Sequence, residues 1–141
     1  MLRKASAEWN GGIKDGKGKI STDSGVLADT QYSFSTRFED GIGTNPEELI
    51  AAAHAGCFSM ALSGQLGAAE LTADSIKTTA AVRLEKGEGG FAITSVHLEV
   101  RATVPNATEE QFATAAANAK AGCPVSKLLN AEITMDAKLE N

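Results

Sequence analysis

The sequence has few cysteines, few aromatic residues and no concentration of positive charge. Two cysteines in 141 residues cannot build the framework of several disulfides that is typical of small secreted proteins. The chain carries 13 basic and 18 acidic side chains, and no cluster of Lys and Arg that could neutralise a row of phosphates. These features argue against a secreted disulfide scaffold and against a nucleic-acid partner.

The chain also has no strongly apolar run of the kind that an export signal or a membrane span requires. The first residues are basic, but Glu8 and Asn10 fall where a secretory signal needs apolar side chains. Residues 49–69 carry no formal charge, yet His54 and several Ser, Gly and Ala residues make this segment only weakly apolar. We therefore expect a cytoplasmic protein, with no membrane partner, in which this segment is a buried helix.

What the sequence does contain is an ordinary globular composition, with 43% hydrophobic and 22% charged residues. A chain of this length is expected to form one domain over residues 1–141. The first third predicts strands, with a tight turn at Asp15-Gly16 between the first two. Their expected bounds are Ala5–Ile13, Gly18–Thr22 and Gln31–Phe38.

A long helix is predicted to begin at Pro46 and to run to about Leu66. Asn45 is suited to cap the helix, Pro46 to occupy its first position, and Glu48 to complete a capping box. The middle of this segment is apolar or small on every side, which is typical of a helix that is covered all round. A domain this small cannot easily supply that cover, which favours a partner subunit.

The second half predicts two strands, two helices and a closing strand. Residues 76–84 alternate as a strand, residues 87–90 turn, and the next strand changes phase near Thr94-Ser95, which indicates a bulge. A helix is predicted from the cap Thr108 to Lys120, ended by Gly122, followed by a short helix after Cys123 and a strand over 133–139. The predicted order is βββ-α-ββ-αα-β, an α+β fold with a long central helix against an antiparallel sheet.

The two cysteines lie in different local environments. Cys57 is in the middle of the long helix among apolar residues, a setting that raises a thiol pKa and is equally typical of a buried structural cysteine. Cys123 directly precedes Pro124 at a helix start, where free backbone N–H groups stabilise a thiolate. The position of Cys123 therefore favours a reactive thiol.

Four further side chains are considered as candidates, and each of them also has a structural interpretation. His54 precedes Cys57 by one helical turn, which allows a base, a metal ligand or a buried structural histidine. With His97 the chain has two His and two Cys, enough for a zinc site, but their spacings match no compact zinc motif. Arg37 is interpreted as a surface charge and Glu47 as a carboxylate that favours the helix dipole.

Two segments resemble the OsmC/Ohr family of hydroperoxide reductases. They are the stretch from Gly43 through Asn45-Pro46-Glu47 to Cys57 and Leu62, and the stretch Gly122-Cys123-Pro124-Val125-Ser126-Lys127. The resemblance extends over essentially the whole chain, from the Trp9-Asn10-Gly11-Gly12 turn through Thr36-Arg37-Phe38-Glu39 to the last strand.

The resemblance implies an intertwined homodimer with two active sites at its interface. It implies that Cys57 is the peroxidatic cysteine and Cys123 the resolving cysteine, with Arg37 and Glu47 beside the reactive thiol. The expected enzyme is a peroxidase of organic hydroperoxides and hydrogen peroxide, active in osmotic and oxidative stress and in antioxidant defence. No metal or organic cofactor is expected, and a dithiol, for example of the lipoyl type, is expected to restore the cysteines.

Two alternatives remain open at this point. The chain could bind small apolar molecules and carry cysteines that take no part in chemistry, or its His and Cys residues could form a structural metal site. Loss of thiols on addition of peroxide distinguishes the peroxidase from the binding protein, and metal content distinguishes the metal site.

Overall fold

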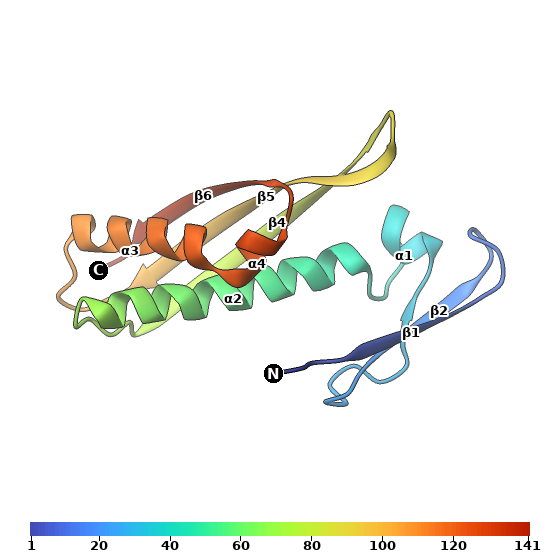
Figure 1. Ribbon diagram of the computed structural model, residues 1–141, viewed down its shortest axis with the longest axis horizontal. Helices are drawn as coiled ribbons and strands as arrows, with labels where there is room; N and C mark the ends of the chain where they lie inside the picture. Colours follow the sequence, from blue (N-terminus) through green and yellow to red (C-terminus); the bar gives the residue numbers. More distant parts are fainter. The chain divides into compact units, whose positions relative to one another are not determined.

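An antiparallel sheet of three short strands forms much of the first part of the chain in the computed structural model, which describes every residue from Met1 to Asn141. The strands are β1 (Ala5–Asn10), β2 (Lys17–Thr22) and β3 (Thr30–Tyr32), in the order β1-β2-β3. This sheet belongs to the first of two units, Met1–Leu49, and the second unit is Ile50–Asn141. Figure 1 shows the first two strands in blue.

The turn between β1 and β2 differs from the tight turn predicted at Asp15-Gly16. Asn10 pairs with Lys17, so residues 11–16 form a six-residue loop. The positive φ angle falls on Gly11, at 99°, and the loop is closed by the backbone N–H of Gly16, which donates to the carbonyl of Gly12 at 2.8 Å. The strand therefore ends three residues earlier than predicted, because the chain turns at the first glycine.

The third predicted strand, Gln31–Phe38, was wrong beyond Tyr32. β3 ends at Tyr32, and a short helix, α1 (Phe34–Phe38), follows it. Ser33 and Thr36 form a capping box in which the Ser33 N–H donates to the Thr36 hydroxyl at 2.8 Å and the Thr36 N–H donates to the Ser33 hydroxyl at 3.3 Å. The strand was predicted from the alternation of Tyr32, Phe34 and Thr36 with polar neighbours, and these local hydrogen bonds favour a helix instead.

The long helix α2 (Pro46–Ala68) begins where the sequence predicted and is two residues longer. The Asn45 side chain accepts a hydrogen bond from the Glu48 N–H at 2.8 Å, as expected of a helix cap. Its amide group also donates to the carbonyl of Thr36 at 3.1 Å, which connects the start of α2 to α1.

The second unit contains a mixed sheet, in the order β4-β5-β6, rather than the antiparallel sheet that was predicted. Strands β4 (Ser75–Gly87) and β5 (Gly90–Thr103) are antiparallel, whereas β6 (Glu132–Leu139) is parallel to β5. The helices α3 (Glu109–Gly122) and α4 (Pro124–Leu128) connect β5 to β6. Such a crossover returns the chain to the end of the sheet where β5 begins, which is what parallel pairing requires.

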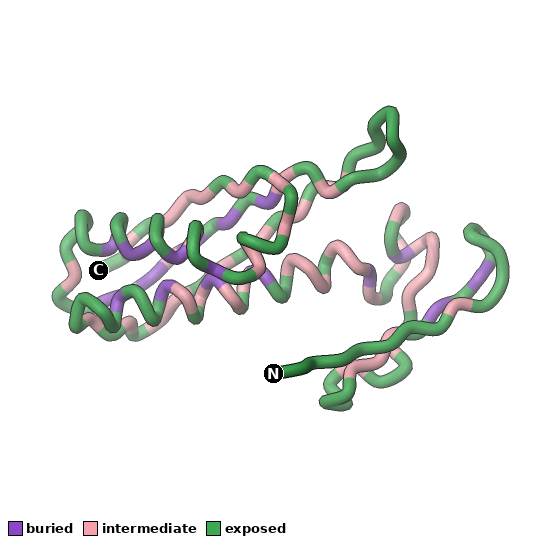
Figure 2. Tube along the Cα trace, viewed as in Figure 1, coloured by how far each residue is buried: buried purple, intermediate pink, exposed green.

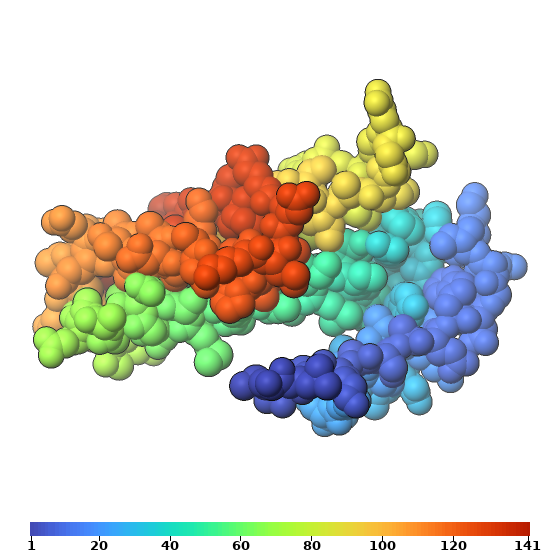
Figure 3. All heavy atoms as spheres, viewed as in Figure 1, coloured from blue at the N-terminus to red at the C-terminus, as the bar shows by residue number.

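The bulge in β5 lies where the change of phase predicted it. Arg83 pairs with Ser95 and Leu84 pairs with Ile93, so Thr94 has no partner in the register. Its hydroxyl donates to the carboxylate of Glu85 at 2.6 Å instead. Beyond the bulge the β4–β5 hairpin continues past the part of the sheet that β6 pairs with, and Figure 3 shows its tip as the yellow projection.

Helix α3 has the predicted capping box and a different end. The Gln111 N–H donates to the Thr108 hydroxyl at 3.1 Å, and the Thr108 N–H donates to the Gln111 side chain at 3.0 Å. Gly122 was predicted to end the helix, but it is the last helical residue and has no positive φ. Cys123 ends α3 and begins α4, because Pro124 after it cannot continue the hydrogen bonding of α3.

The core of the second unit lies between the sheet and its helices. It is formed by side chains of α2, β5 and α3, among them Phe58, Leu62, Leu66, Val96, Leu98, Val100 and Phe112. Full burial of each such side chain contributes about 1.5–3 kcal/mol. The core fixes which face of α2 points to the sheet, and so fixes the direction of Cys57, which packs at its margin.

Only one stripe of α2 is covered within the chain, which differs from a helix covered on every side. The buried residues of α2 are His54, Phe58, Leu62 and Leu66, spaced four apart. Figure 2 shows α2 mostly in green and pink, the colours of exposed and intermediate residues. Met60 on another face is 79% exposed. By length and hydropathy alone α2 could cross a membrane, but its large apolar side chains Phe58, Leu62 and Leu66 pack in the core.

Candidate active site

The two cysteines lie in contact, although they are 66 residues apart in the chain. Their Sγ atoms are 2.7 Å apart and share a hydrogen bond, and both thiols are free. Cys57 is half-buried in α2, and Cys123 is fully buried at the junction of α3 and α4. The packing of α2 and α3 on the same sheet therefore brings the two sulfur atoms together.

The surroundings of the two thiols favour a negative charge on Cys123. Burial raises the pKa of the Cys57 thiol, and its hydrogen bond with Cys123 acts in the same direction. For Cys123 burial opposes ionisation, but the Cys57 thiol and the nearby N–H groups of Val125 and Ser126 outweigh it, and the pKa of Cys123 is lowered. Both directions agree with what the local sequence predicted for the two cysteines.

Cys123 owes this lowered pKa to the start of α4. It occupies the N-cap position, although it closes no capping hydrogen bond of ordinary geometry. The N–H groups of the first turn of α4 act on its sulfur, as does the hydroxyl of Ser126. Sequence analysis did not single out Ser126 by itself, but its place three residues after the N-cap is the position whose N–H and side chain lie over that cap.

His54 contacts Ser126 rather than Cys57. The spacing of His54 and Cys57 in the sequence had allowed His54 to act as a base for the Cys57 thiol. The imidazole is fully buried, and its Nε2 lies 2.7 Å from the Ser126 hydroxyl. Its Nδ1 is buried without a hydrogen-bond partner. Burial lowers the pKa of His54, so the ring is neutral at pH 7.

Arg37 and Glu47 form a bidentate ion pair within the first unit. The Arg37 Nη2 lies 2.8 Å from Glu47 Oε1, and Arg37 Nε lies 3.0 Å from the same oxygen and 3.3 Å from Oε2. The Glu47 side chain is 13% exposed, and that of Arg37 is 38% exposed. The guanidinium also lies over the Phe38 ring, 5.1 Å from its centroid. Glu47 and Phe38 therefore hold the Arg37 side chain in one orientation, whereas a solvated surface arginine has no fixed orientation.

Arg37 forms part of the wall of an aromatic pocket of about 230 Å³. The other residues of the wall are Trp9, Ile13, Tyr32, Ser33, Phe34 and Phe38. The Trp9 and Tyr32 rings lie 5.5 Å apart on the two outer strands, β1 and β3. Gly18 of β2 pairs with both residues, and a Cβ at Gly18 would overlap the Tyr32 ring. The pocket combines apolar surface with one fixed cation, which suits an apolar molecule that has one polar group.

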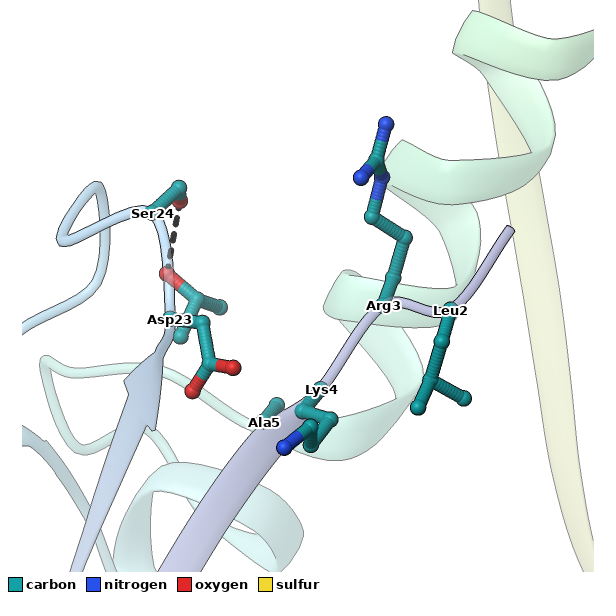
Figure 4. A pocket seen from close by; sticks show the side chains of 7 residues that line it. Leu2, Arg3, Lys4, Ala5, Asp23 and Ser24 are labelled. Carbon is teal, nitrogen blue, oxygen red and sulfur yellow. Dashed lines mark hydrogen bonds between the residues drawn. The ribbon is translucent and has the colours of Figure 1, made fainter.

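A larger hollow near the N-terminus has no aromatic, cysteine or histidine side chain in its wall. It is lined by Leu2, Arg3, Lys4, Ala5, Thr22, Asp23 and Ser24. Figure 4 shows Arg3 and Leu2 extending away from Asp23 and Ser24. The Thr22 and Ser24 hydroxyls share a hydrogen bond of 3.1 Å. With no cysteine or histidine in its wall, this hollow is a surface feature.

The residues that could bind a metal do not gather at one place. No group of three or more His, Cys, Asp or Glu side chains is arranged to hold a metal ion. His97, the second histidine of the proposed zinc set, is exposed on β5 and shares a hydrogen bond of 2.7 Å with the Thr134 hydroxyl.

Comparisons with known proteins agree with this arrangement. The chain is 55% identical over 139 residues to Peroxiredoxin OsmC of Escherichia coli, covering 99% of this chain and 97% of that one. It is 33% identical over 124 residues to the organic hydroperoxide resistance protein OhrB of Bacillus subtilis, covering 87% and 88% of the two chains. It also resembles the crystal structure of an organic hydroperoxide resistance protein from Elizabethkingia anophelis, with a TM-score of 0.73, 26% identity and 99% of both chains covered. A family model described as OsmC-like protein matches residues 39–138. The chain therefore belongs to the OsmC-like protein family.

Proposed function

We propose that this protein is a thiol-dependent peroxidase that reduces organic hydroperoxides, and also hydrogen peroxide, with Cys57 and Cys123 as its redox pair. The observation that carries the proposal is the distance of 2.7 Å between the two Sγ atoms. Two relatives named Peroxiredoxin OsmC and organic hydroperoxide resistance protein OhrB support the reaction class.

In the proposed reaction the Cys57 thiolate attacks the outer oxygen of the peroxide. The O–O bond breaks, an alcohol or water leaves, and Cys57 becomes a sulfenic acid. Cys123 then attacks the Cys57 sulfur, a disulfide forms, and the sulfenic oxygen leaves as water. The contact between the two sulfur atoms supports this second step, because the disulfide can form with little movement of α2 or α4.

The proposed role of Arg37 is to offset the cost of a charged Cys57. The surroundings of Cys57 in its own chain raise its pKa, so a cation is needed to form the thiolate at neutral pH. A guanidinium can also hold the peroxide oxygens. Glu47 would hold the guanidinium in position through the bidentate pair.

We place Arg37 and Glu47 beside Cys57 across a homodimer interface. Glu47 and Cys57 are ten residues apart on the unbroken helix α2, which corresponds to a rise of roughly 15 Å. A glutamate side chain cannot span that distance, and it leans toward the N-terminus of the helix, away from Cys57. Two antiparallel copies of α2 across a two-fold axis would bring Glu47 of one chain to Cys57 of the other and cover the exposed faces of α2.

The aromatic pocket would receive the organic part of the substrate. Its wall offers the Trp9, Tyr32 and Phe34 rings to an apolar tail, and Arg37 to the peroxide group. Such a pocket favours organic hydroperoxides over hydrogen peroxide, since hydrogen peroxide has no tail to bury.

The proposed reaction also indicates an electron donor and a cellular compartment. The reaction needs two electrons from outside the chain, and the proposed donor is a dithiol, for example of the lipoyl type. A reversible cysteine pair requires a reducing compartment, so the proposed location is the cytoplasm, and the proposed role is defence against osmotic and oxidative stress. We also infer that both units belong to one OsmC-like domain over residues 1–141.

The deciding experiment measures consumption of cumene hydroperoxide and of hydrogen peroxide by the purified protein. Dihydrolipoamide, glutathione and thioredoxin are compared as electron donors. Sustained consumption with a dithiol, faster for cumene hydroperoxide, is the expected result. If peroxide leaves the thiols intact, the protein is a binding protein for apolar molecules and the proposed function is wrong.

A further inference from the structure

The buried His54 contacts Ser126 in the first turn of α4, the helix that Cys123 precedes as its N-cap, and the proposed peroxide step makes no use of this contact. The Ser126 hydroxyl is 2.7 Å from His54 Nε2. Ser126 is also the third residue of α4, the position whose N–H and side chain face the N-cap residue Cys123, and both groups lower the pKa of that thiol. All three residues belong to the second unit, where His54 is on α2, Ser126 is on α4, and Cys123 is at the junction before α4.

The proton positions in this chain follow from the partners of the imidazole. His54 is fully buried and its Nδ1 has no partner. If Nδ1 carried the ring proton, a donor would be buried without an acceptor, which folded proteins avoid more strictly than an unused lone pair. The proton therefore belongs on Nε2, where it is donated to the Ser126 oxygen. The hydroxyl proton of Ser126 is then free to be donated to the Cys123 sulfur.

We propose that His54 is a positioning residue that, through Ser126, holds a hydrogen-bond donor on the Cys123 sulfur and so makes Cys123 the leaving group when the disulfide is reduced. The inference rests on the proposed function for the existence of the disulfide. Its consequence is that the external thiol attacks Cys57 and not Cys123.

The accessibility of the two sulfurs supports the same direction of attack. Cys123 is 0% exposed, whereas Cys57 is half-buried at the margin of the core. Thiol–disulfide exchange is faster when the departing sulfur is the better-stabilised thiolate. The backbone N–H groups at the start of α4 also favour charge on Cys123. The Ser126 hydroxyl adds a further donor, and its orientation is set by the contact with His54 of α2.

A dithiol reduces the Cys57–Cys123 disulfide in two exchange steps. A thiolate of the dithiol attacks the Cys57 sulfur, a new S–S bond forms, and the Cys57–Cys123 bond breaks with its electron pair on Cys123. The second thiolate of the reductant then attacks its own sulfur in the mixed disulfide and releases the Cys57 thiolate. The reductant loses two electrons and becomes a disulfide, and the two protons that its thiols release are matched by protonation of the Cys123 and Cys57 thiolates.

The first test measures the pKa of Cys123 directly, without peroxide. In a Cys57→Ser background Cys123 is the only thiol, and its ionisation is followed by the ultraviolet absorbance of the thiolate. We expect Ser126→Ala and His54→Phe to raise this pKa by roughly one unit. Ser126→Thr, which keeps the hydroxyl, and His54→Gln, which places an amide N–H near the position of Nε2, should restore most of the shift.

This design separates positioning from a loss of structure. Far-ultraviolet circular dichroism and thermal melting establish that each variant is folded. If the folded Ser126→Ala and Ser126→Thr variants have the same pKa for Cys123, the hydroxyl has no role and the proposal is overturned. The measurement does not depend on peroxidase activity, so its failure is distinct from failure of the proposed function.

The second test identifies the sulfur that is attacked. Protein oxidised to the disulfide is treated briefly with 2-mercaptoethanol, quenched with acid and alkylated, and the peptides are identified by mass spectrometry. We expect the mixed disulfide on Cys57 and the alkyl group on Cys123, with the rate of its formation reduced roughly two- to ten-fold by Ser126→Ala. A mixed disulfide found chiefly on Cys123 would overturn the proposal.

Discussion

The Sγ atoms of Cys57 and Cys123 lie 2.7 Å apart, and the groups around them favour charge on Cys123. Two sulfur atoms at this distance cannot both ionise near neutral pH, because the second charge is opposed by the first. Within one chain Cys123, the proposed resolving cysteine, therefore has the lower thiol pKa. The peroxidatic role proposed for Cys57 therefore depends on a cation from outside its own surroundings.

Cys57→Ser is expected to abolish peroxidase turnover without unfolding the protein. Serine is nearly isosteric with cysteine but cannot form a sulfenic acid, and Cys57 lies at the margin of the core. Steady-state peroxide consumption and a thermal melt measure the two effects. Turnover comparable to that of the wild type would remove Cys57 from the mechanism.

Cys123→Ser should still react once with peroxide and then stop. Without a resolving thiol 2.7 Å away, the sulfenic acid on Cys57 persists and is oxidised further to sulfinic or sulfonic acid. Intact-mass spectrometry after addition of peroxide should show one to three added oxygens and no intramolecular disulfide. An undiminished disulfide yield would contradict the pairing.

Arg37→Ala is expected to slow alkylation of Cys57 at neutral pH by roughly ten-fold, since loss of a neighbouring cation raises the thiol pKa by about one unit. Arg37→Lys is the matched control: it keeps the charge but loses the bidentate contact with Glu47, and should have an intermediate rate. The pH profile of alkylation is measured in a Cys123→Ser background. Identical pH profiles for the Arg37, Arg37→Ala and Arg37→Lys proteins would show that Arg37 does not influence the Cys57 thiol.

A mixed dimer of Cys57→Ser and Glu47→Ala chains tests whether the site is shared between subunits. If Glu47 acts across the interface, one site has both lesions and the other has none, so about half of the wild-type activity should return. Two different affinity tags isolate the mixed dimer, and the two mutant homodimers are the controls. Activity no higher than that of the homodimers would show that the site lies within one chain.

Acid should destabilise the wild-type protein more than the His54→Gln variant. Burial lowers the pKa of His54 in the folded state, so below the ordinary value of about 6.5 the unfolded chain binds the proton first. The free energy of unfolding then falls with pH by at most about 1.4 kcal/mol per unit, until the folded pKa is reached. Urea denaturation between about pH 8 and pH 5 measures the difference. Parallel curves for the two proteins would mean that His54 titrates normally.

Much of the secondary structure could be predicted because it depends on neighbouring residues. Asn45 with Pro46, and Thr108 with Gln111, mark the starts of α2 and α3 through hydrogen bonds that span three residues. The bulge at Thr94 could be located because a single change of phase moves every later side chain to the other face. α1 was missed although its capping box is also local, because the alternation of Tyr32, Phe34 and Thr36 with polar neighbours suggested a strand.

The candidate site was predicted only in part. The resemblance to a known family implied that Cys57 and Cys123 act together, and local sequence indicated which thiol is the more acidic. The pairing of His54 with Ser126 could not be predicted, because the two residues are 72 positions apart and meet only when α4 lies beside α2.

Local sequence was sufficient for the helix starts, the strand periods and the acidity of a cysteine before Pro124, since each depends on atoms within a few residues of the chain. The parallel pairing of β6 with β5, the contact of the two sulfur atoms and the contact of Ser126 with a buried imidazole were decided by packing. Such contacts join residues that are far apart in the chain, and they arise because the apolar stripe of α2 has only one sheet face on which it can be buried.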